Sequence, residues 1–380
     1  MADDISKPTE ADAYQRFPDA ETPQGACAGV KLVDGAKAEW EKRLDTFNDQ
    51  AGKDRVKVEV AAAALANLTE EERRFLPNSA KVYLASRVPN TPEGYEAQAK
   101  VLSASSYGSM GFTSWEEEGQ AKFYRALAAD PFISEAQQRW NDASFGDEDR
   151  LEAARRIHQL QMDAFGGKQE PISLKDDLKS HGTHYGATQE IKLSRSPGMG
   201  IHQPVFAEFL DTISHETMHS IQQQIIERAA LLKGIEASVL EDLNVKSVHE
   251  LAGDGKGIFA AVRAQKIAEA FPGDPGSWNR ELRDDGRLAG VVPMFRYQME
   301  EGGYMPVSIA GEDNYIRNPI EMQAFFFGSN TAKFIKANTE ERSAILTTLD
   351  KNAEIDRSIH ARRTQERETI LTAPKPCQCT

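Results

Sequence analysis

The segment from Pro204 to Arg228 constrains the fold more than any other part of the chain. Its apolar residues recur at steps of three and four, which is the spacing of one face of a helix. Within it, His215, Glu216 and His219 form the pattern His-Glu-x-x-His. On a helix, these two histidines lie one turn apart and point the same way. The segment therefore predicts a helix with two imidazoles on one side.

This predicted helix is apolar on more than one side, because Phe209, Met218 and Ile226 lie off the main stripe. Such a helix is usually buried, and buried imidazoles and carboxylates need partners. Two histidines one turn apart can hold one Zn²⁺, with Glu216 as the general base toward a water on the metal. The alternative is an exposed helix that carries two histidines by chance. Burial favours the metal site.

Composition limits the classes of protein to consider. The chain has 380 residues, 45 Lys plus Arg against 59 Asp plus Glu, and a net charge of -14. This balance argues against a broad nucleic-acid footprint. We expect no membrane span, since no window approaches 18 uninterrupted apolar residues. Three cysteines near the two ends form no disulfide framework. The start shows no Sec-type signal, so we expect a cytoplasmic protein or one secreted without such a signal.

Composition and the spacing of apolar residues predict three parts of the chain. Residues 1–36 are polar and rich in Pro and Gly, which predicts a disordered segment. In residues 37–146 the apolar residues have helical spacing, and no set of catalytic or metal-binding residues stands out. This predicts a helical N-terminal region. Residues 147–372 hold the motif helix and its neighbours, with an insertion at about 230–310. We expect the third part to be the functional domain.

The elements before the motif helix suggest its fold. Asp147–Phe165 is amphipathic and ends at a glycine pair, residues 171–174 read as a short strand, and 190–194 alternate strictly. This order resembles the N-terminal half of zinc metallopeptidases of the zincin fold. The resemblance implies that residues 185–194 form the strand that borders the cleft and pairs with an extended substrate. A plain hairpin in a mixed sheet remains an alternative. The predicted class is α+β: mainly helical, with a small mixed sheet beside the motif helix.

A catalytic zinc usually has three protein ligands, so one more is needed. Gln222 and Ile225 exclude the extended metzincin motif, which has Gly and His there. His249 and Glu321 are the candidates. The stretch from Asn318 to Ala324 resembles the Asn-Pro-x-Glu-x-x-Ala pattern of gluzincins. That resemblance implies that Glu321 is the third metal ligand, on a helix that Pro319 opens, with Ala324 allowing close helix packing.

The same resemblance implies a function. It implies a zinc metallopeptidase in which His215, His219 and Glu321 bind Zn²⁺ and Glu216 is catalytic, with a protein or peptide as substrate. Tyr304 and Tyr315 are candidates to stabilise the oxyanion. The setting would be cytoplasmic, or that of a leaderless bacterial effector or toxin. Two alternatives stay open: an inactive zincin-like binding or scaffold protein, and a zinc hydrolase with a non-peptide substrate.

Overall fold

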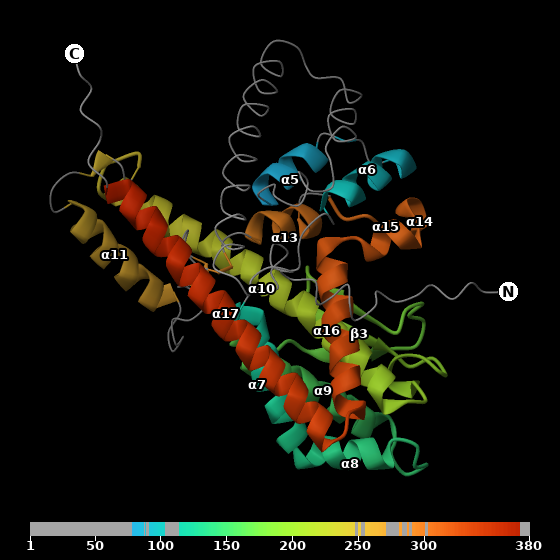
Figure 1. Cartoon of the computed structure of the whole chain (residues 1–380). Helices are drawn as coiled ribbons and strands as arrows, with labels where there is room; N and C mark the ends of the chain where they lie inside the picture. Colours follow the sequence, from blue (N-terminus) through green and yellow to red (C-terminus); the bar gives the residue numbers. More distant parts are fainter. Residues whose placement is uncertain are drawn as a thin grey trace, which may run out of the picture. The chain divides into compact units, whose positions relative to one another are not determined.

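The computed structural model describes most of the chain from residue 78 onward. The described residues are 78–86, 88, 91–102, 114–247, 250–251, 255–270, 281–282, 287–288, 291–300 and 303–372. They are mainly helical with one three-stranded mixed sheet, which confirms the predicted α+β class (Figure 1). The predicted disordered segment 1–36 lies outside them.

The chain divides into two compact units, and the division falls inside one helix, α16 (Pro319–Lys336). Residues up to Phe112 and Pro293–Gln323 form the first unit. Thr113–Val292 and Ala324–Thr380 form the second. The predicted division into domains stays a prediction.

The first unit is built from short helices around one apolar core. These helices are α5 (Asn78–Ala85), α6 (Pro92–Leu102), α13 (Val292–Met299), α14 (Val307–Ala310) and α15 (Glu312–Ile316). The core joins Tyr95 and Leu102 of α6 to Met294 and Tyr297 of α13 and to Met305. Segments far apart in the sequence therefore share one core.

The second unit is framed by four helices. They are α7 (Ser114–Ala129), α8 (Pro131–Arg139), α9 (Asp147–Phe165) and α17 (Thr339–Thr372). α7 and α8 pack on α9, and α17 lies along α7 (Figure 1). Stacked rings of Phe123 and Phe327, and of Tyr124 and Phe334, join α7 to the later part of α16. Aromatic pairs of this kind stabilise a core beyond their buried area.

Local signals explain where two of these helices begin and end. The Asp130 side chain accepts a hydrogen bond from the Ile133 N–H and caps α8, whose first residue is a proline. α9 begins at Asp147 and ends at Phe165, as the sequence predicts. Gly166 follows it with a φ of 75°, a left-handed conformation that glycine adopts without strain.

The sheet holds β1 (Ile172–Lys175), β2 (Gly182–Tyr185) and β3 (Glu190–Ser194) in the order β1-β3-β2. β3 pairs in parallel with β1 and antiparallel with β2. The predicted cleft-bordering strand over 185–194 is therefore wrong. A turn separates β2 from β3, and β3 lies in the centre with both sides paired. β2 and β3 form the plain hairpin, and β1 and β2 are the two edge strands of the sheet.

The motif helix is α10, from Phe206 to Asp242. Pro204 precedes this helix instead of opening it, and the helix runs well past the predicted end at Arg228. The reason is that buried apolar residues continue, among them Leu232 and Val239. The end of α10 packs on α11 (Gly255–Ala270) through a core of Val239, Leu251 and Phe259.

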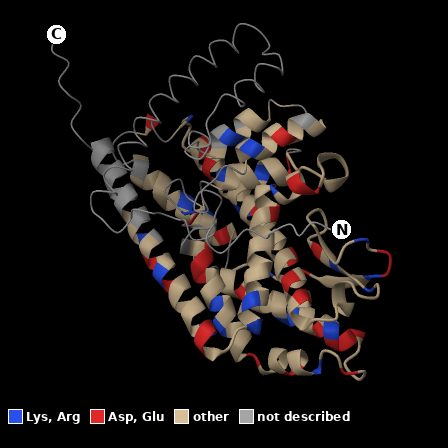
Figure 2. Ribbon diagram, turned by 45° about the vertical axis from the view of Figure 1, so that its right-hand side comes forward, with Lys and Arg blue, Asp and Glu red and all other residues tan. Residues whose placement is uncertain are grey.

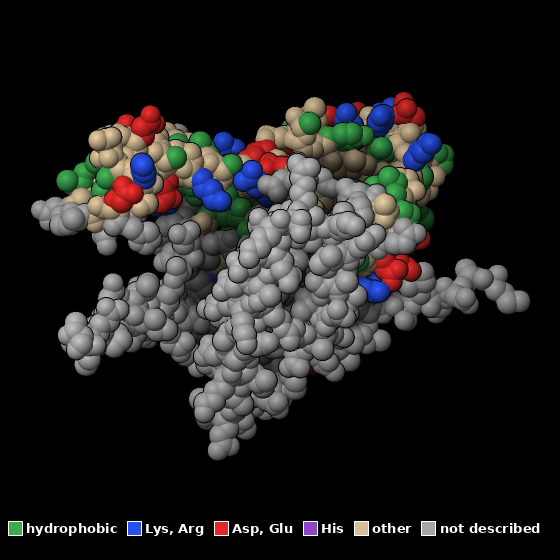
Figure 3. Space-filling model, turned by 90° about the horizontal axis from the view of Figure 1, so that it is seen from above, with side chains coloured by type: hydrophobic (Ala, Val, Ile, Leu, Met, Phe, Trp, Pro, Cys, Tyr) green, Lys and Arg blue, Asp and Glu red, His purple; other side chains and the backbone are tan. Residues whose placement is uncertain are grey.

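Charged residues of both signs alternate along the described helices (Figure 2). On the face drawn in Figure 3, basic and acidic side chains of the described residues are interspersed among apolar ones. Some of these charges link helices, since Arg125 of α7 pairs with Asp350 of α17, and Glu118 of α7 pairs with Arg357 of α17. Among the described residues, none of the helices combines the length and apolar character that a membrane span requires.

Candidate metal centre

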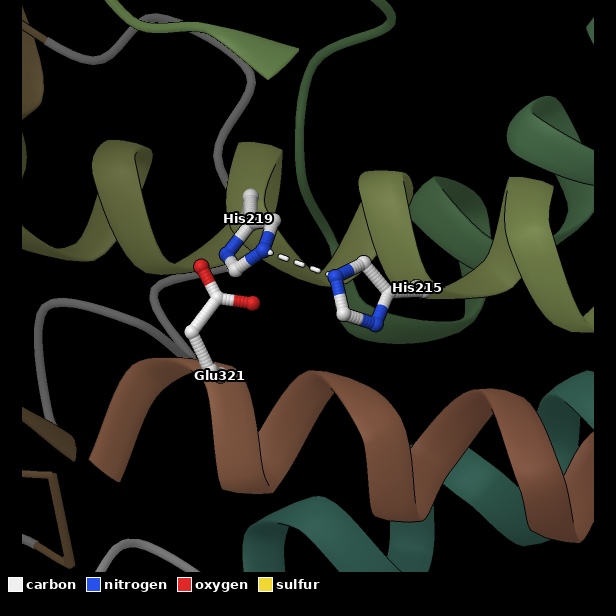
Figure 4. A group of neighbouring side chains, drawn as sticks. All are labelled: His215, His219 and Glu321. Atoms are coloured by element: carbon white, nitrogen blue, oxygen red, sulfur yellow. Dashed lines mark hydrogen bonds between the residues drawn. The ribbon is translucent and has the colours of Figure 1, made fainter. Parts of the chain in front are cut away.

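Three predicted metal ligands form one buried group. His215 and His219 come from α10 and Glu321 from the first turn of α16 (Figure 4). Their exposed fractions are 8%, 8% and 3%, and one ligand atom of each lies within 4.8 Å of the others. This group could hold a metal ion. The rival candidate, His249, lies outside the described residues.

The two imidazoles face each other through the same kind of nitrogen. The Nε2 atoms of His215 and His219 are 3.1 Å apart. On the far side of its ring, His219 Nδ1 lies 2.8 Å from Gln222 Oε1, which only accepts hydrogen bonds. Nδ1 therefore carries the hydrogen, and Nε2 presents a lone pair toward His215. Two nitrogens at about 2.0–2.1 Å from one tetrahedral ion are separated by about 3.4 Å, close to the spacing found here.

Two tyrosines hold the Glu321 carboxylate. The Tyr304 hydroxyl donates to one oxygen at 2.8 Å and the Tyr315 hydroxyl to the other at 3.0 Å. Burial, and then the nearby carboxylate, raise the pKa of Tyr304 far above its usual value, so it remains a donor. Each hydroxyl has one hydrogen, and Glu321 receives it in both cases. Positioning the carboxylate is the role that this geometry supports, and the contact of either tyrosine with an oxyanion stays a prediction.

Asn318 fixes the segment from which Tyr304 projects. Its side chain is fully buried; Nδ2 donates to the Met305 carbonyl and Oδ1 accepts from the Met305 N–H, both at 3.0 Å. Gln298 donates to the same Oδ1 and accepts from the Ile320 N–H. The asparagine of the Asn-Pro pair thereby ties residue 305 to the start of α16. This explains why an amide, with both a donor and an acceptor, precedes Pro319.

Glu216 lies beside the edge strand β2. Its exposed fraction is 7%, and the part of the chain that the structure describes forms no hydrogen bond to its carboxylate. A Cβ at Gly182 of β2 would lie 2.9 Å from Glu216 Cγ and 3.2 Å from its Oε1. Glycine is therefore the residue that lets the strand approach the carboxylate this closely.

α16 approaches α10 at a second glycine. A Cβ at Gly328 would lie 2.6 Å from the Asp211 carbonyl oxygen, so no larger residue fits without a shift. One turn earlier, Ala324 is fully buried. The predicted apolar cluster 325–327 is only partly in the core, because Phe325 is 39% exposed. Its ring packs edge-on against His215, with centroids 4.5 Å apart.

The sequence patterns indicate the three candidate ligands and Glu216, but neither Gly182 nor the contact of Phe325 with His215. A glycine inside a short strand was the available signal for the first. The second depends on the direction in which α16 runs, which no local pattern gives. Comparisons of this chain with family models, with curated proteins and with solved structures found no match.

Proposed function

We propose that this protein is a zinc-dependent metallopeptidase. The observation that carries the proposal is the buried group of two imidazoles and one carboxylate on α10 and α16, with Glu216 next to one of the imidazoles in the chain. The metal's identity and the reaction are two separate parts of the proposal. Both rest on the chemistry of the donor set.

Two nitrogens and one carboxylate oxygen suit zinc. A catalytic zinc site typically uses three protein ligands and leaves a further position open, and two histidines with one glutamate are a known set. Calcium and magnesium prefer sites built from oxygens alone. The hydrogen bond from His219 Nδ1 to Gln222 is the kind of outer contact that fixes a ligand's tautomer.

The residues around the group have distinct tasks in the proposed reaction. When bound, zinc would polarise the scissile carbonyl and lower the pKa of a water molecule. Glu216 takes the proton from that water and passes it to the leaving amine. Tyr304 and Tyr315 hold the Glu321 carboxylate from both sides, so its direction does not depend on the metal alone.

A protein or peptide is the proposed substrate because β2 lies at the edge of the sheet and packs along α10. The backbone of an extended peptide can add to such an edge through hydrogen bonds that do not depend on its sequence. Gly182 brings this edge to Glu216, the proposed general base.

The test combines metal content with hydrolysis. The full chain is purified, its zinc is counted by elemental analysis, and cleavage of labelled casein and of a quenched-fluorescence peptide library is measured with and without a chelator. The Glu216→Gln variant is the control, because it keeps the metal ligands.

We expect about one zinc per chain in both proteins, and cleavage by the wild type alone. A chain that binds no zinc overturns the proposal. Zinc binding without cleavage of either probe overturns the peptidase assignment, and leaves the scaffold and the non-peptide hydrolase.

A further inference from the structure

A second polar network lies on another face of α10. It centres on Glu170, in the loop between α9 and β1, whose carboxylate binds three side chains. His184 of β2 lies 2.9 Å and Ser220 of α10 lies 2.8 Å from one oxygen, and Gln224 of α10 lies 3.0 Å from the other. The side chains of Glu170 and His184 are each only 3% exposed.

Hydrogen bonds keep this buried carboxylate charged. Burial alone would raise the pKa of Glu170, but the hydrogen bonds from His184, Gln224 and Ser220 outweigh it and lower the pKa below the usual value. Removing one partner of such a buried group leaves the other uncompensated, which costs more than the net strength of the bond. The contact between His184 and Glu170 is therefore a strong constraint on β2.

Glu170 is itself anchored to α9. Its backbone N–H donates to His158 Nε2 at 3.0 Å, so the hydrogen of that ring is on Nδ1, which donates to Thr217 at 3.0 Å. The Thr217 hydroxyl donates its own hydrogen bond to the Ile213 carbonyl within α10. α9, α10 and β2 are thus joined through one loop residue.

The spacing of these contacts aligns β2 with α10. Gly182 and His184 are two residues apart, so they point to the same side of the strand, about 6.6 Å apart. Glu216 and Ser220 are four residues apart on the helix, a rise of about 6 Å. Gly182 meets Glu216 directly, and His184 meets Ser220 through Glu170. The spacing of Gly182 and His184 along the strand matches that of Glu216 and Ser220 along the helix. The network therefore holds the strand in one register along the helix.

A change of register would move the wrong residue onto Glu216. A shift of one residue turns the Gly182 face of β2 away, and a shift of two residues brings the His184 side chain to the place where only glycine fits. The register of β2 therefore determines which residue lies against Glu216, the carboxylate that the proposed reaction uses.

We propose that Glu170 and His184 are positioning residues that hold β2 in register on α10, and thereby hold Glu216 in place for proton transfer. This proposal rests on the proposed peptidase function for its effect on catalysis. Its structural half, the register of β2, stands apart from any activity.

The test replaces His184 in two ways. His184→Leu removes the hydrogen-bond donor, and His184→Gln keeps an N–H near the position of Nε2. The matched control is Glu227→Ala, which breaks another contact between the hairpin and α10, the hydrogen bonds from Gln189 to Glu227. Four quantities are measured for each full-length chain. They are the hydrogen exchange of the β2 amides, the zinc content, and kcat and KM on a library peptide that the wild type cleaves.

His184→Leu should exchange at least 10-fold faster at residues 182–185, keep one zinc per chain and lose at least 10-fold in kcat, with KM changed less than 3-fold. His184→Gln should recover most of both effects, and Glu227→Ala should change neither. Unchanged exchange in His184→Leu, or equal effects of Leu and Gln, overturns the proposal. If the wild type cleaves nothing, the peptidase function fails, and the exchange pattern alone decides whether His184 sets the register.

Discussion

Two faces of α10 carry polar side chains with opposite arrangements. On one face, His215 and His219 bring two Nε2 atoms to 3.1 Å. On the other face, Thr217 accepts a hydrogen bond from His158 Nδ1, and Ser220 donates one to Glu170. A proton between the two nitrogens satisfies one pair on the first face, whereas a cation satisfies both nitrogens and the nearby Glu321 carboxylate together.

The difference distinguishes a polar group that serves the fold from one prepared for a ligand. Both faces are buried, so burial does not separate them. The pairing of donors with acceptors separates them. On the second face, donors of the protein meet acceptors of the protein, whereas the first face gathers three groups that are all suited to donate electron pairs to one ion. Changes on the first face should therefore affect chemistry and metal, and changes on the second should affect folding and its pH dependence.

The largest expected effect is at Glu216, which follows His215 in the chain and lies against β2. Glu216→Gln should lower kcat by about 10³-fold, since an amide cannot accept the proton that a general base must take. Zinc content and the melting temperature should stay near those of the wild type. Wild-type kcat in a variant that holds zinc would remove Glu216 from the mechanism.

The next effect concerns the third ligand. Glu321→Ala should weaken zinc binding by more than about 100-fold, because losing a ligand costs more than losing an outer contact. Competition with a coloured chelator measures the affinity. His249→Ala is the control, and its affinity should match the wild type. A larger loss in the control than in Glu321→Ala would identify His249 as the ligand.

On the second face, we expect a pH-dependent loss of stability. Burial lowers the pKa of His158 to about 4, below the value of about 6.5 for an unfolded chain. The folded protein thus favours the neutral ring, and stability is full above pH 6.5 and falls as the pH drops toward 4. The loss is about 2–3 kcal/mol.

Urea unfolding of the metal-free wild type and His158→Gln between pH 7 and 4.5 tests this, because Glu170 contributes mainly below that window. His158→Gln should start less stable and lose less. Parallel pH curves for the two chains would show that His158 does not titrate as expected.

The smallest effect should come from the tyrosines. Tyr304→Phe should weaken zinc binding by about 10-fold with little loss of stability, because one of two hydrogen bonds to Glu321 is removed. The double variant with Tyr315→Phe should lose more than the sum of the free-energy changes of the single variants. Simple additivity would mean that the hydroxyls do not share the task of orienting the carboxylate.

Local signals predicted much of the fold and most of the site. The ends of α9 follow from periodicity and the Gly166 cap, and Pro319 begins α16 as expected. The ligands on α10 follow from a spacing of four residues on a helix. The prediction that failed, the strand over 185–194, depends on tertiary contacts. β3 is central because β1 pairs with it on the side opposite to β2.

The network around Glu170 was also beyond the sequence, because His158, Glu170 and His184 come from three elements with no common pattern. The sequence offers Tyr304 and Tyr315 as candidates for an oxyanion contact, whereas their hydrogen bonds to Glu321 depend on how Asn318 holds the segment before α16.

Gly182 has a consequence for how this chain can drift in evolution. Its backbone does not require glycine, since its φ is not positive. The restriction comes from side chains: a Cβ there would lie 2.9 Å from Glu216 Cγ and 3.2 Å from Leu193 Cδ2. A descendant in which Glu216 became a shorter residue would be released from the closer of these two contacts, and alanine at position 182 would then need only a small shift of Leu193. A larger residue at position 182 is therefore expected only together with a change at position 216.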